Sequence, residues 1–192
     1  MLFRSEFIEL LAGLMRPATG TIQLHDVDIT REDVRGRRDA GIAYVPADRK
    51  GEGLAPAGSV LENAIAGFQR QLARRGWLSS ESVTDHTSQL LDTFDVVHSS
   101  VDAPVSSLSG GNQQKLMIGR EMMHEPQVLL AAQPTRGVDV GGIRNIHGML
   151  QQERDRGAAV ILSSEDLDEL MDLSDEIIVF FSGDRKSTRL NS

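Results

Sequence analysis

The 192-residue sequence contains no cysteine, which excludes disulfide bonds and thiolate-bound metal sites. It has no apolar run of about 18–20 residues, the length that a helix needs to cross a bilayer. We therefore expect any role at a membrane to require a partner. Acidic residues outnumber basic ones by 28 to 20. Because nucleic acids are bound chiefly by clustered Lys and Arg, this balance disfavours a nucleic-acid partner. The five histidines lack metal-ligand spacing, so we expect no histidine metal site.

Short apolar runs alternate with helical patterns along the chain, which predicts right-handed crossovers and a parallel α/β sheet. The predicted strands are residues 21–24, 41–45, 128–132, 158–162 and 177–181. The predicted helices are residues 6–15, 31–39, 59–76, 80–94, 111–124, 141–156 and 165–171. Residues 47–58 are predicted to be a long surface loop and residues 101–108 to be irregular. The helical stretches from residue 59 to residue 94 predict a small helical subdomain inserted between strands.

A serine and two glycines open the predicted helix near residue 110, in the run Leu108-Ser109-Gly110-Gly111-Asn112-Gln113-Gln114-Lys115. Free backbone N–H groups at the positive end of a helix dipole form a seat for a phosphate. The alternative is that Ser-Gly-Gly is merely a turn and N-cap before an amphipathic helix. The strand at 128–132 and the following Pro134-Thr135-Arg136-Gly137-Val138-Asp139 favour the phosphate interpretation.

Together these motifs resemble the second nucleotide-binding half of the two-cassette ATPase subunits of bacterial sugar and nucleoside importers, in the ABC family. The resemblance extends from about Ser5 to Gly183 and is most specific at residues 45–49, 108–115 and 133–141. It implies a P-loop NTPase-like parallel sheet flanked by helices, within a partial ATP-binding domain at residues 5–183. It also implies an inserted α-helical subdomain at about residues 55–123.

The resemblance also implies cofactors and partners. ATP and Mg²⁺ would bind in the intact assembly, where two ATP molecules lie between two cassettes and each half supplies part of each site. The partner cassette would be the first half of the same parent chain. Transmembrane permease subunits would bind the helical subdomain directly, and a solute-binding protein would act indirectly. The expected location is the cytoplasmic face of the bacterial plasma membrane, where the parent couples ATP hydrolysis to solute import.

By the same resemblance, the LSGGNQQ segment faces the phosphate loop of the opposite cassette. Ser109, Gly110, Gly111 and Gln113 are therefore candidate ATP-binding residues, the first three donating to the γ-phosphate. Asp139 matches an aspartate that, in this family, crosses the dimer interface near the partner's phosphate loop, so it is a further candidate ATP-binding residue. Its alternative role, an N-cap for the helix beginning near residue 141, is equally compatible with the sequence.

The chain departs from the family pattern at four polar positions. Ala132 and Gln133 stand where an acidic Mg²⁺ ligand and the catalytic glutamate are expected, Ala47 replaces a glutamine near the metal, and Ser164 replaces the switch histidine. Glutamine can orient a water molecule but cannot accept its proton, and loss of a general base typically lowers the rate by a factor of about 10²–10⁴. We therefore expect the site on this strand to be feeble or inactive. The apolar strand also fits a purely structural role.

Both ends of the sequence depart from the family. Ser5 aligns with the last hydroxyl of the phosphate-binding loop, and residues 1–4 supply neither its glycines nor its lysine. Residues 185–192 show no strand or helix periodicity, so both flanks are expected to be foreign to the domain. The isolated chain should then bind ATP poorly, and the sequence leaves its status as an enzyme open. The alternatives are a soluble ABC ATPase acting on nucleic acid or ribosomes, or an interaction module without catalysis.

Overall fold

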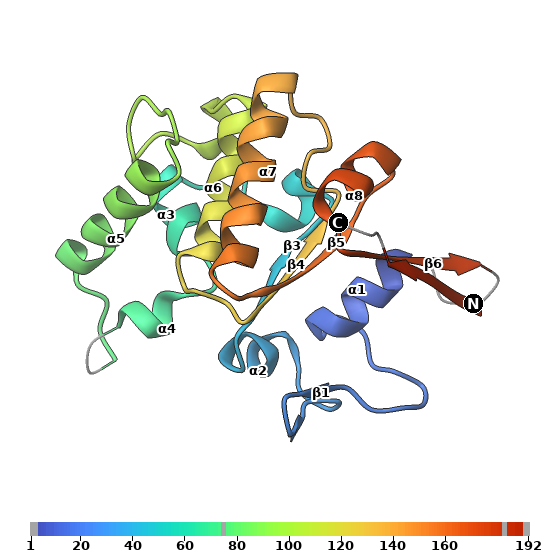
Figure 1. Cartoon of the computed structure of the whole chain (residues 1–192). Helices are drawn as coiled ribbons and strands as arrows, with labels where there is room; N and C mark the ends of the chain where they lie inside the picture. Colours follow the sequence, from blue (N-terminus) through green and yellow to red (C-terminus); the bar gives the residue numbers. More distant parts are fainter. Residues whose placement is uncertain (1–3, 74–75, 182–183, 190–192) are drawn as a thin grey trace. The chain divides into compact units, whose positions relative to one another are not determined.

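The computed structural model describes residues 4–73, 76–181 and 184–189, which form two compact units (Figure 1). Unit 1 comprises Met1–Val45, Glu125–Pro134 and His147–Ser192, and unit 2 comprises Pro46–His124 and Thr135–Ile146. In the described parts of the chain, none of the helices combines the length and the apolar composition that a bilayer-spanning segment requires.

A three-stranded parallel sheet forms the centre of unit 1, with the strand order β3-β4-β5. The strands are β3 (Ile42–Val45), β4 (Val128–Ala132) and β5 (Ala159–Ser163). Helix α1 (Arg4–Ala12) contacts all three strands. The middle strand is the most deeply buried, because β4 has a neighbour on each side, and its Val-Leu-Leu-Ala-Ala sequence suits that place. The predicted parallel α/β sheet is confirmed.

Helix α1 ends three residues earlier than predicted. Its last residue is Ala12, and Gly13 has a φ of 83°, a left-handed conformation that favours glycine. A Cβ atom at Gly13 would also lie 2.9 Å from the backbone carbon of Asp33. The apolar residues after position 12 continue the helical pattern, but the backbone of Gly13 ends the helix.

The segment after α1 forms a small hairpin and a short helix in unit 1. These elements are β1 (Gln23–Leu24), β2 (Val27–Asp28) and α2 (Val34–Asp39). The helix begins three residues later than predicted, because Asp33 caps it by accepting a hydrogen bond from the N–H of Gly36. The buried guanidinium of Arg37 joins α2 to α1 by donating to the carbonyl oxygen of Leu11 at 2.8 Å. Burial lowers the pKa of Arg37.

The end of unit 1 differs from what the sequence predicts. Helix α8 (Leu167–Leu173) leads to β6 (Glu176–Phe181), which pairs antiparallel with β7 (Asp184–Arg189) in a separate two-stranded sheet. The strand predicted at 177–181 therefore does not join the parallel sheet in the described part of the chain. Residues 185–189 show no strand periodicity in the sequence but form part of β7, because backbone hydrogen bonds between paired strands require no apolar periodicity. Residues 190–192 lie outside the described residues.

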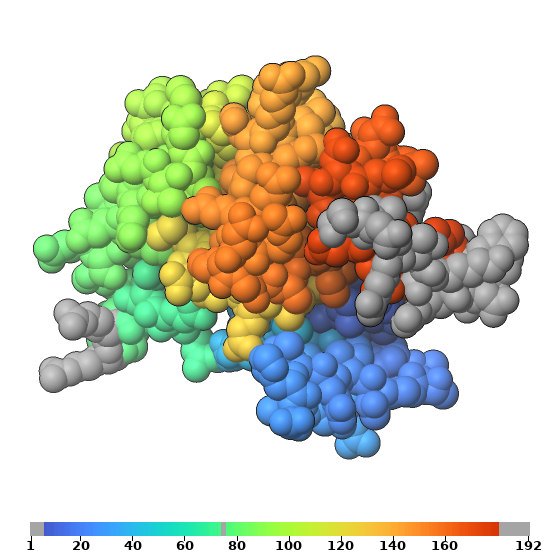
Figure 2. All heavy atoms as spheres, viewed as in Figure 1, coloured from blue at the N-terminus to red at the C-terminus, as the bar shows by residue number. Residues whose placement is uncertain are grey.

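Unit 2 is helical and is organised around α6 (Gly110–Met122). Elements of the unit that pack on this helix include η1 (Arg49–Gly53), α3 (Val60–Ile65) and α5 (Ser80–Thr93). Leu116, Met117 and Ile118 are completely buried there. In Figure 2 the green residues of α5 cover much of the surface of this unit on the side in view. The remaining elements are α4 (Gln69–Leu72), the 3₁₀ turn η2 (Val105–Ser107) and the beginning of α7 (Val140–Asp155).

Two predictions for unit 2 need correction. The single helix predicted over 59–76 is interrupted after Ile65, because Gly67 has a φ of 86° that no α-helix accommodates. The predicted loop at 47–58 contains the π-helical turn η1, in which the carboxylate of Asp48 accepts hydrogen bonds from the N–H groups of Lys50 and Gly51. This capping carboxylate gives the loop a defined conformation.

Candidate functional site

Ser109 is the N-cap of α6. Its Oγ accepts hydrogen bonds from the backbone N–H of Asn112 at 3.3 Å and from Asn112 Nδ2 at 3.0 Å, and its carbonyl oxygen accepts the N–H of Gln113. The capping alternative for Ser109 is thus observed. The residue is also exposed, so capping leaves the serine at the surface where a ligand can reach it.

Gly110 and Gly111 form the first turn of α6, and the fold does not require glycine at either position. A Cβ atom at Gly110 would lie 3.4 Å from Arg49 Nη2 and 3.5 Å from the carbonyl oxygen of Gly137, and a Cβ at Gly111 would lie 3.9 Å from Asp139 Oδ2. These are ordinary van der Waals distances. First-turn N–H groups have no carbonyl partner inside a helix and lie at the positive end of its dipole. The missing side chains therefore leave these donors accessible to an anion.

Gln113 lies on the buried side of the same turn. Its Nε2 donates to the carbonyl oxygens of Leu108 at 3.0 Å and Val105 at 3.3 Å, and the residue is 7% exposed. The structure thus places this predicted ATP-binding side chain inside unit 2, where it holds the segment immediately before Ser109.

Arg49 reaches this turn from η1, and the sequence analysis assigned it no role. Its Nε donates to Gln113 Oε1 at 3.1 Å and its Nη1 donates to Gln114 Oε1 at 3.3 Å. Both glutamines are buried. The motif at residues 45–49 was noticed in the sequence, but neither periodicity nor spacing shows that Arg49 contacts α6.

Asp139 is the N-cap of α7. Its Oδ1 accepts the N–H of Gly142 at 2.9 Å, and its carbonyl oxygen accepts the N–H of Ile143. The capping alternative for Asp139 is therefore observed. The residue is exposed, and its predicted contact across a dimer interface stays a prediction.

The carboxyl ends of β4 and β5 bring Ala132, Gln133 and Ser164 together in unit 1. Ala132 pairs with Ser163 in the sheet register, and the N–H of Gln133 donates to the carbonyl oxygen of Ser163 at 2.7 Å. Gln133 has a φ of 49°, and its Oε1 accepts the N–H of Glu165 at 3.3 Å. Ser164 is 6% exposed, and its Oγ accepts the N–H of Asp166. The side chains of Gln133 and Ser164 therefore accept hydrogen bonds from the backbone of the loop after β5.

The residues at this strand end do not fit a Mg²⁺ ion. Magnesium prefers carboxylate and phosphate oxygens, and neither Ala132, Gln133 nor Ser164 has a carboxylate. Across the described ranges, no group of three or more His, Asp or Glu side chains could hold a metal. Ala132, Gln133 and Ser164 therefore supply neither a carboxylate for a metal ion nor a carboxylate base for a water molecule.

Two other predicted positions have simple placements. Ala47 is half-buried in the loop that precedes η1 in unit 2. Ser5 lies in the first turn of α1, and its side chain is outside the part of the chain that the structure describes.

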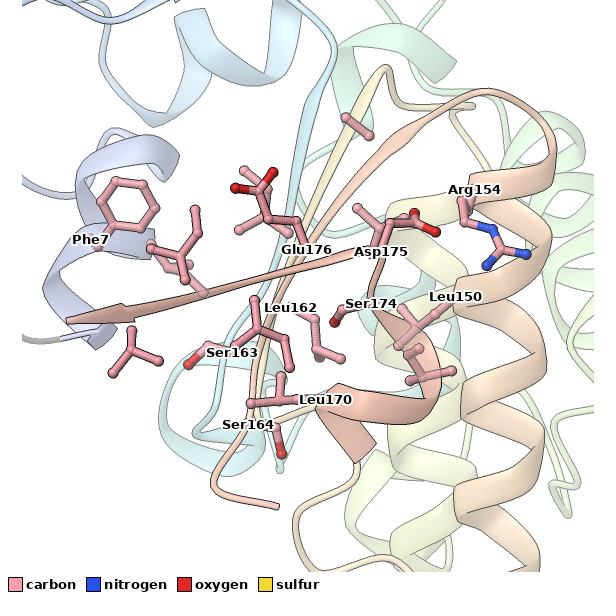
Figure 3. A pocket seen from close by; sticks show the side chains of 18 of the residues that line it. Phe7, Leu150, Arg154, Leu162, Ser163, Ser164, Leu170, Ser174, Asp175 and Glu176 are labelled. Carbon is pink, nitrogen blue, oxygen red and sulfur yellow. The ribbon is translucent and has the colours of Figure 1, made fainter. Parts of the chain in front are cut away.

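A cavity of about 850 Å³ lies beside β5 in unit 1. Figure 3 shows Phe7 of α1 on one side of it and Leu150 and Arg154 of α7 on another, with Leu162 and Leu170 between them. Most of the lining side chains are aliphatic or aromatic. A triphosphate requires several cationic or N–H donors, so this cavity does not fit one. The exposed glycine turn of α6 is the better candidate for phosphate binding.

Comparison with known proteins agrees with these features. The family described as "ABC transporter" matches residues 4–136, which include both the β4 strand and the α6 turn. The chain belongs to the ABC transporter family.

Curated relatives in this family are import ATP-binding proteins. The chain is 38% identical over 182 residues to the nucleoside import ATP-binding protein NupA of Lactococcus lactis, with 94% of this chain and 36% of that protein covered. It is 40% identical over 185 residues to the glucose import ATP-binding protein TsgD13 of Haloferax volcanii, with 94% of this chain and 34% of that protein covered. The chain thus spans about a third of the length of these relatives.

Solved structures confirm the fold class. The dimeric ATP-binding cassette MJ0796 superposes with a TM-score of 0.81 at 22% sequence identity, with 98% of this chain and 82% of that chain covered. A nucleotide-free ATP-binding cassette from an ABC transporter superposes with a TM-score of 0.80 at 23% identity, with 96% of this chain and 75% of that chain covered. The fold is therefore the α/β, P-loop NTPase-like fold of an ABC cassette.

Proposed function

We propose that this chain is part of the ATP-binding subunit of an importer for simple sugars or nucleosides, and that it corresponds to the second of two cassettes. In this proposal, Ser109, Gly110 and Gly111 bind the γ-phosphate of an ATP molecule held mainly by the partner cassette. The open first turn of α6 carries the proposal, since it combines a surface serine with two glycines that the fold does not require. The names of the relatives support the import role.

The chemistry of the glycine turn suits this role. The γ-phosphate carries much of the negative charge of ATP, and backbone N–H groups at a helix start stabilise it without a basic side chain. A side chain longer than hydrogen at residue 110 or 111 would occupy the space through which the phosphate approaches.

The second site of the pair would be built on β4 and would be degenerate. Ala132 cannot bind Mg²⁺ or a water molecule bound to it, and Gln133 cannot accept a proton from an attacking water. Hydrolysis in the assembly would therefore occur at the site whose metal ligands and catalytic glutamate belong to the partner cassette. Mg²⁺ would accompany the ATP bound there.

The proposed partners follow from an import role. The ATP-binding domain would extend over residues 5–183, and its helical part, about residues 55–123, would dock on a transmembrane permease at the cytoplasmic face of the membrane. A solute-binding protein would act through that permease, and no nucleic acid would take part. The partner cassette would be the first half of the same parent polypeptide.

Ser109→Arg in the assembled importer tests the proposal directly. The arginine side chain would occupy the phosphate path, so we expect ATPase activity to fall by at least about 100-fold, the scale of losing a main transition-state contact. Ser106→Arg is the matched control, because Ser106 is also exposed and lies three residues earlier in the chain. It should retain activity within about twofold, since surface substitutions away from a site have small effects.

Two outcomes would contradict the proposal. ATPase activity that survives Ser109→Arg would show that α6 does not meet the phosphate. ATPase stimulated by RNA or ribosomes, and not by a permease, would place the chain among the soluble members of the family.

A further inference from the structure

We propose that Arg49 is a positioning residue, which sets the conformation of the glycine turn of α6 from the neighbouring turn η1. The inference rests on the proposed function in one respect, namely that the glycine turn binds a phosphate. The contacts that carry it all lie within unit 2.

The first step is the fixed backbone of Arg49. Asp48 accepts hydrogen bonds from the N–H groups of Lys50 and Gly51, and the carbonyl oxygen of Arg49 accepts the N–H of Leu54 at 2.8 Å. These bonds hold η1 as a turn of π-helix, a rare conformation that is frequent at functional sites. The guanidinium therefore extends from a backbone with little freedom.

The second step is the close packing of η1 on α6. Gly53 lies so near to Met117 that a Cβ at residue 53 would collide with the sulfur of Met117. Arg120, further along α6, donates from Nη2 to the carbonyl oxygen of Gly53 at 3.0 Å. The C-terminal end of η1 is thus bound to the later part of α6 through Gly53. Arg49, at the N-terminal end of η1, binds the first turn of α6.

The third step is a relay of hydrogen bonds through Gln113. The Nε of Arg49 donates to Gln113 Oε1, and Gln113 Nε2 donates to the carbonyl oxygen of Leu108, the residue just before Ser109. Because both ends of the amide are used, its orientation is defined. Arg49 thereby fixes the chain at the point where it enters the glycine turn.

The guanidinium of Arg49 also borders the glycine turn. The hydrogen bonds that it donates go to the amide oxygens of Gln113 and Gln114. Its Nη2 would lie 3.4 Å from a Cβ at Gly110, so the positive group borders the turn. A guanidinium beside the helix start adds to the positive end of the helix dipole.

Arg49→Ala and Lys50→Ala test the inference as a matched pair. Each removes one positive charge from η1, but Lys50 is exposed, whereas Arg49 donates hydrogen bonds to Gln113 and Gln114 of α6. By NMR on the isolated chain, we expect the amide protons of Asn112 and Gln113 to exchange about tenfold faster in Arg49→Ala, since two hydrogen bonds are lost. Lys50→Ala should leave these rates within about twofold, as a surface substitution does.

A kinetic readout separates positioning from folding. In the assembled importer, Arg49→Ala should raise the KM for ATP about tenfold and change kcat by less than about threefold, because the loosened turn weakens ground-state and transition-state contacts alike. Arg49→Lys should restore part of the KM, since one ammonium group can bond only one of the two amide oxygens well. If Arg49→Ala does not fold, Arg49→Lys can be used for the same KM and exchange measurements.

The outcomes distinguish this inference from the proposed function. If exchange and KM stay unchanged in both Arg49 variants while Ser109→Arg remains inactive, Arg49 does not position the turn and the phosphate role stands. If Ser109→Arg is active, the proposed function fails, and the exchange rates alone still decide whether Arg49 orders the turn. Equal effects of Arg49→Ala and Lys50→Ala would overturn the inference in favour of a general charge effect.

Discussion

The end of β4 and the start of α6 differ in how the chain presents polar groups. At the strand end, side chains supply the polar groups, and Gln133 and Ser164 are bonded to the backbone of the loop after β5. At the helix start, the backbone supplies them, and the glycines at 110 and 111 leave the N–H groups accessible. A single substitution can remove the polar group of a side chain, whereas backbone donors persist for as long as the helix begins at that residue.

This difference separates scaffold from site. Both β4 and α6 contain completely buried residues, and the start of α6 presents backbone N–H groups of the kind that bind anions.

Truncation of a core leucine should lower the free energy of unfolding by a similar amount in β4 and in α6. Leu130 in β4 and Leu116 in α6 are both 0% exposed, so Leu130→Ala and Leu116→Ala should each lower the free energy of unfolding by about 2–5 kcal/mol in urea denaturation. Leu167→Ala is the control, because Leu167 is 61% exposed and should cost less than about 1 kcal/mol. A small loss at Leu130 alone would show that β4 is loosely packed.

Gly111→Ala should separate stability from activity at the helix start. Alanine is the better helix former and meets no close contact there, so the free energy of unfolding should be unchanged or rise by up to about 1 kcal/mol. ATPase activity of the assembly should fall at least about tenfold, because the methyl group stands in the path of the phosphate. Gly148→Ala in α7 is the control, since residue 148 also has open space and lies outside the turn. If Gly111→Ala were destabilised but kept its ATPase activity, residue 111 would matter for folding and not for phosphate binding.

Substitution of Asp139 should distinguish a cap from an interface contact. Asp139→Ala removes the acceptor for the N–H of Gly142 and should lower stability by about 1 kcal/mol in thermal or urea unfolding. Asp139→Asn keeps an equivalent cap and should retain stability. If the asparagine variant nevertheless loses ATPase activity, the carboxylate acts across the interface as the family resemblance suggests. Full ATPase activity in Asp139→Asn would show that the role of Asp139 is to cap α7.

Acid should weaken unit 2 through His86. Burial lowers the pKa of His86 below its ordinary value of 6.5, and its Nε2 has no hydrogen-bond partner in the described structure. The unfolded chain therefore binds this proton more readily, so stability is complete above pH 6.5 and falls as the pH is lowered toward the folded pKa. His86→Gln should reduce the dependence of Tm on pH in this range. His98→Gln, at an exposed histidine, should leave that dependence as it is.

Local sequence signals predicted the strands and the family well. The apolar run at 128–132 became β4 with the same bounds, and the Ser-Gly-Gly run became the start of α6 within one residue. Such elements are predictable because each is encoded by neighbouring residues. Family membership followed from the same short runs, which the comparisons confirm.

Backbone conformation and long-range pairing accounted for the errors. Gly13 and Gly67 ended helices whose side-chain pattern continues, because φ is decided by the backbone and not by apolarity. Strand β7 formed from a segment without apolar alternation, since pairing with β6 satisfies its backbone.

The amino-acid sequence alone determined that Ser109 is present and that positions 132 and 133 hold no carboxylate, because these are statements about single residues. Tertiary structure alone decided which groups meet. Arg49 and Gln113 are 64 residues apart and contact one another only when η1 packs on α6. No periodicity or local spacing encodes that contact, because it depends on the folding of all the chain between them.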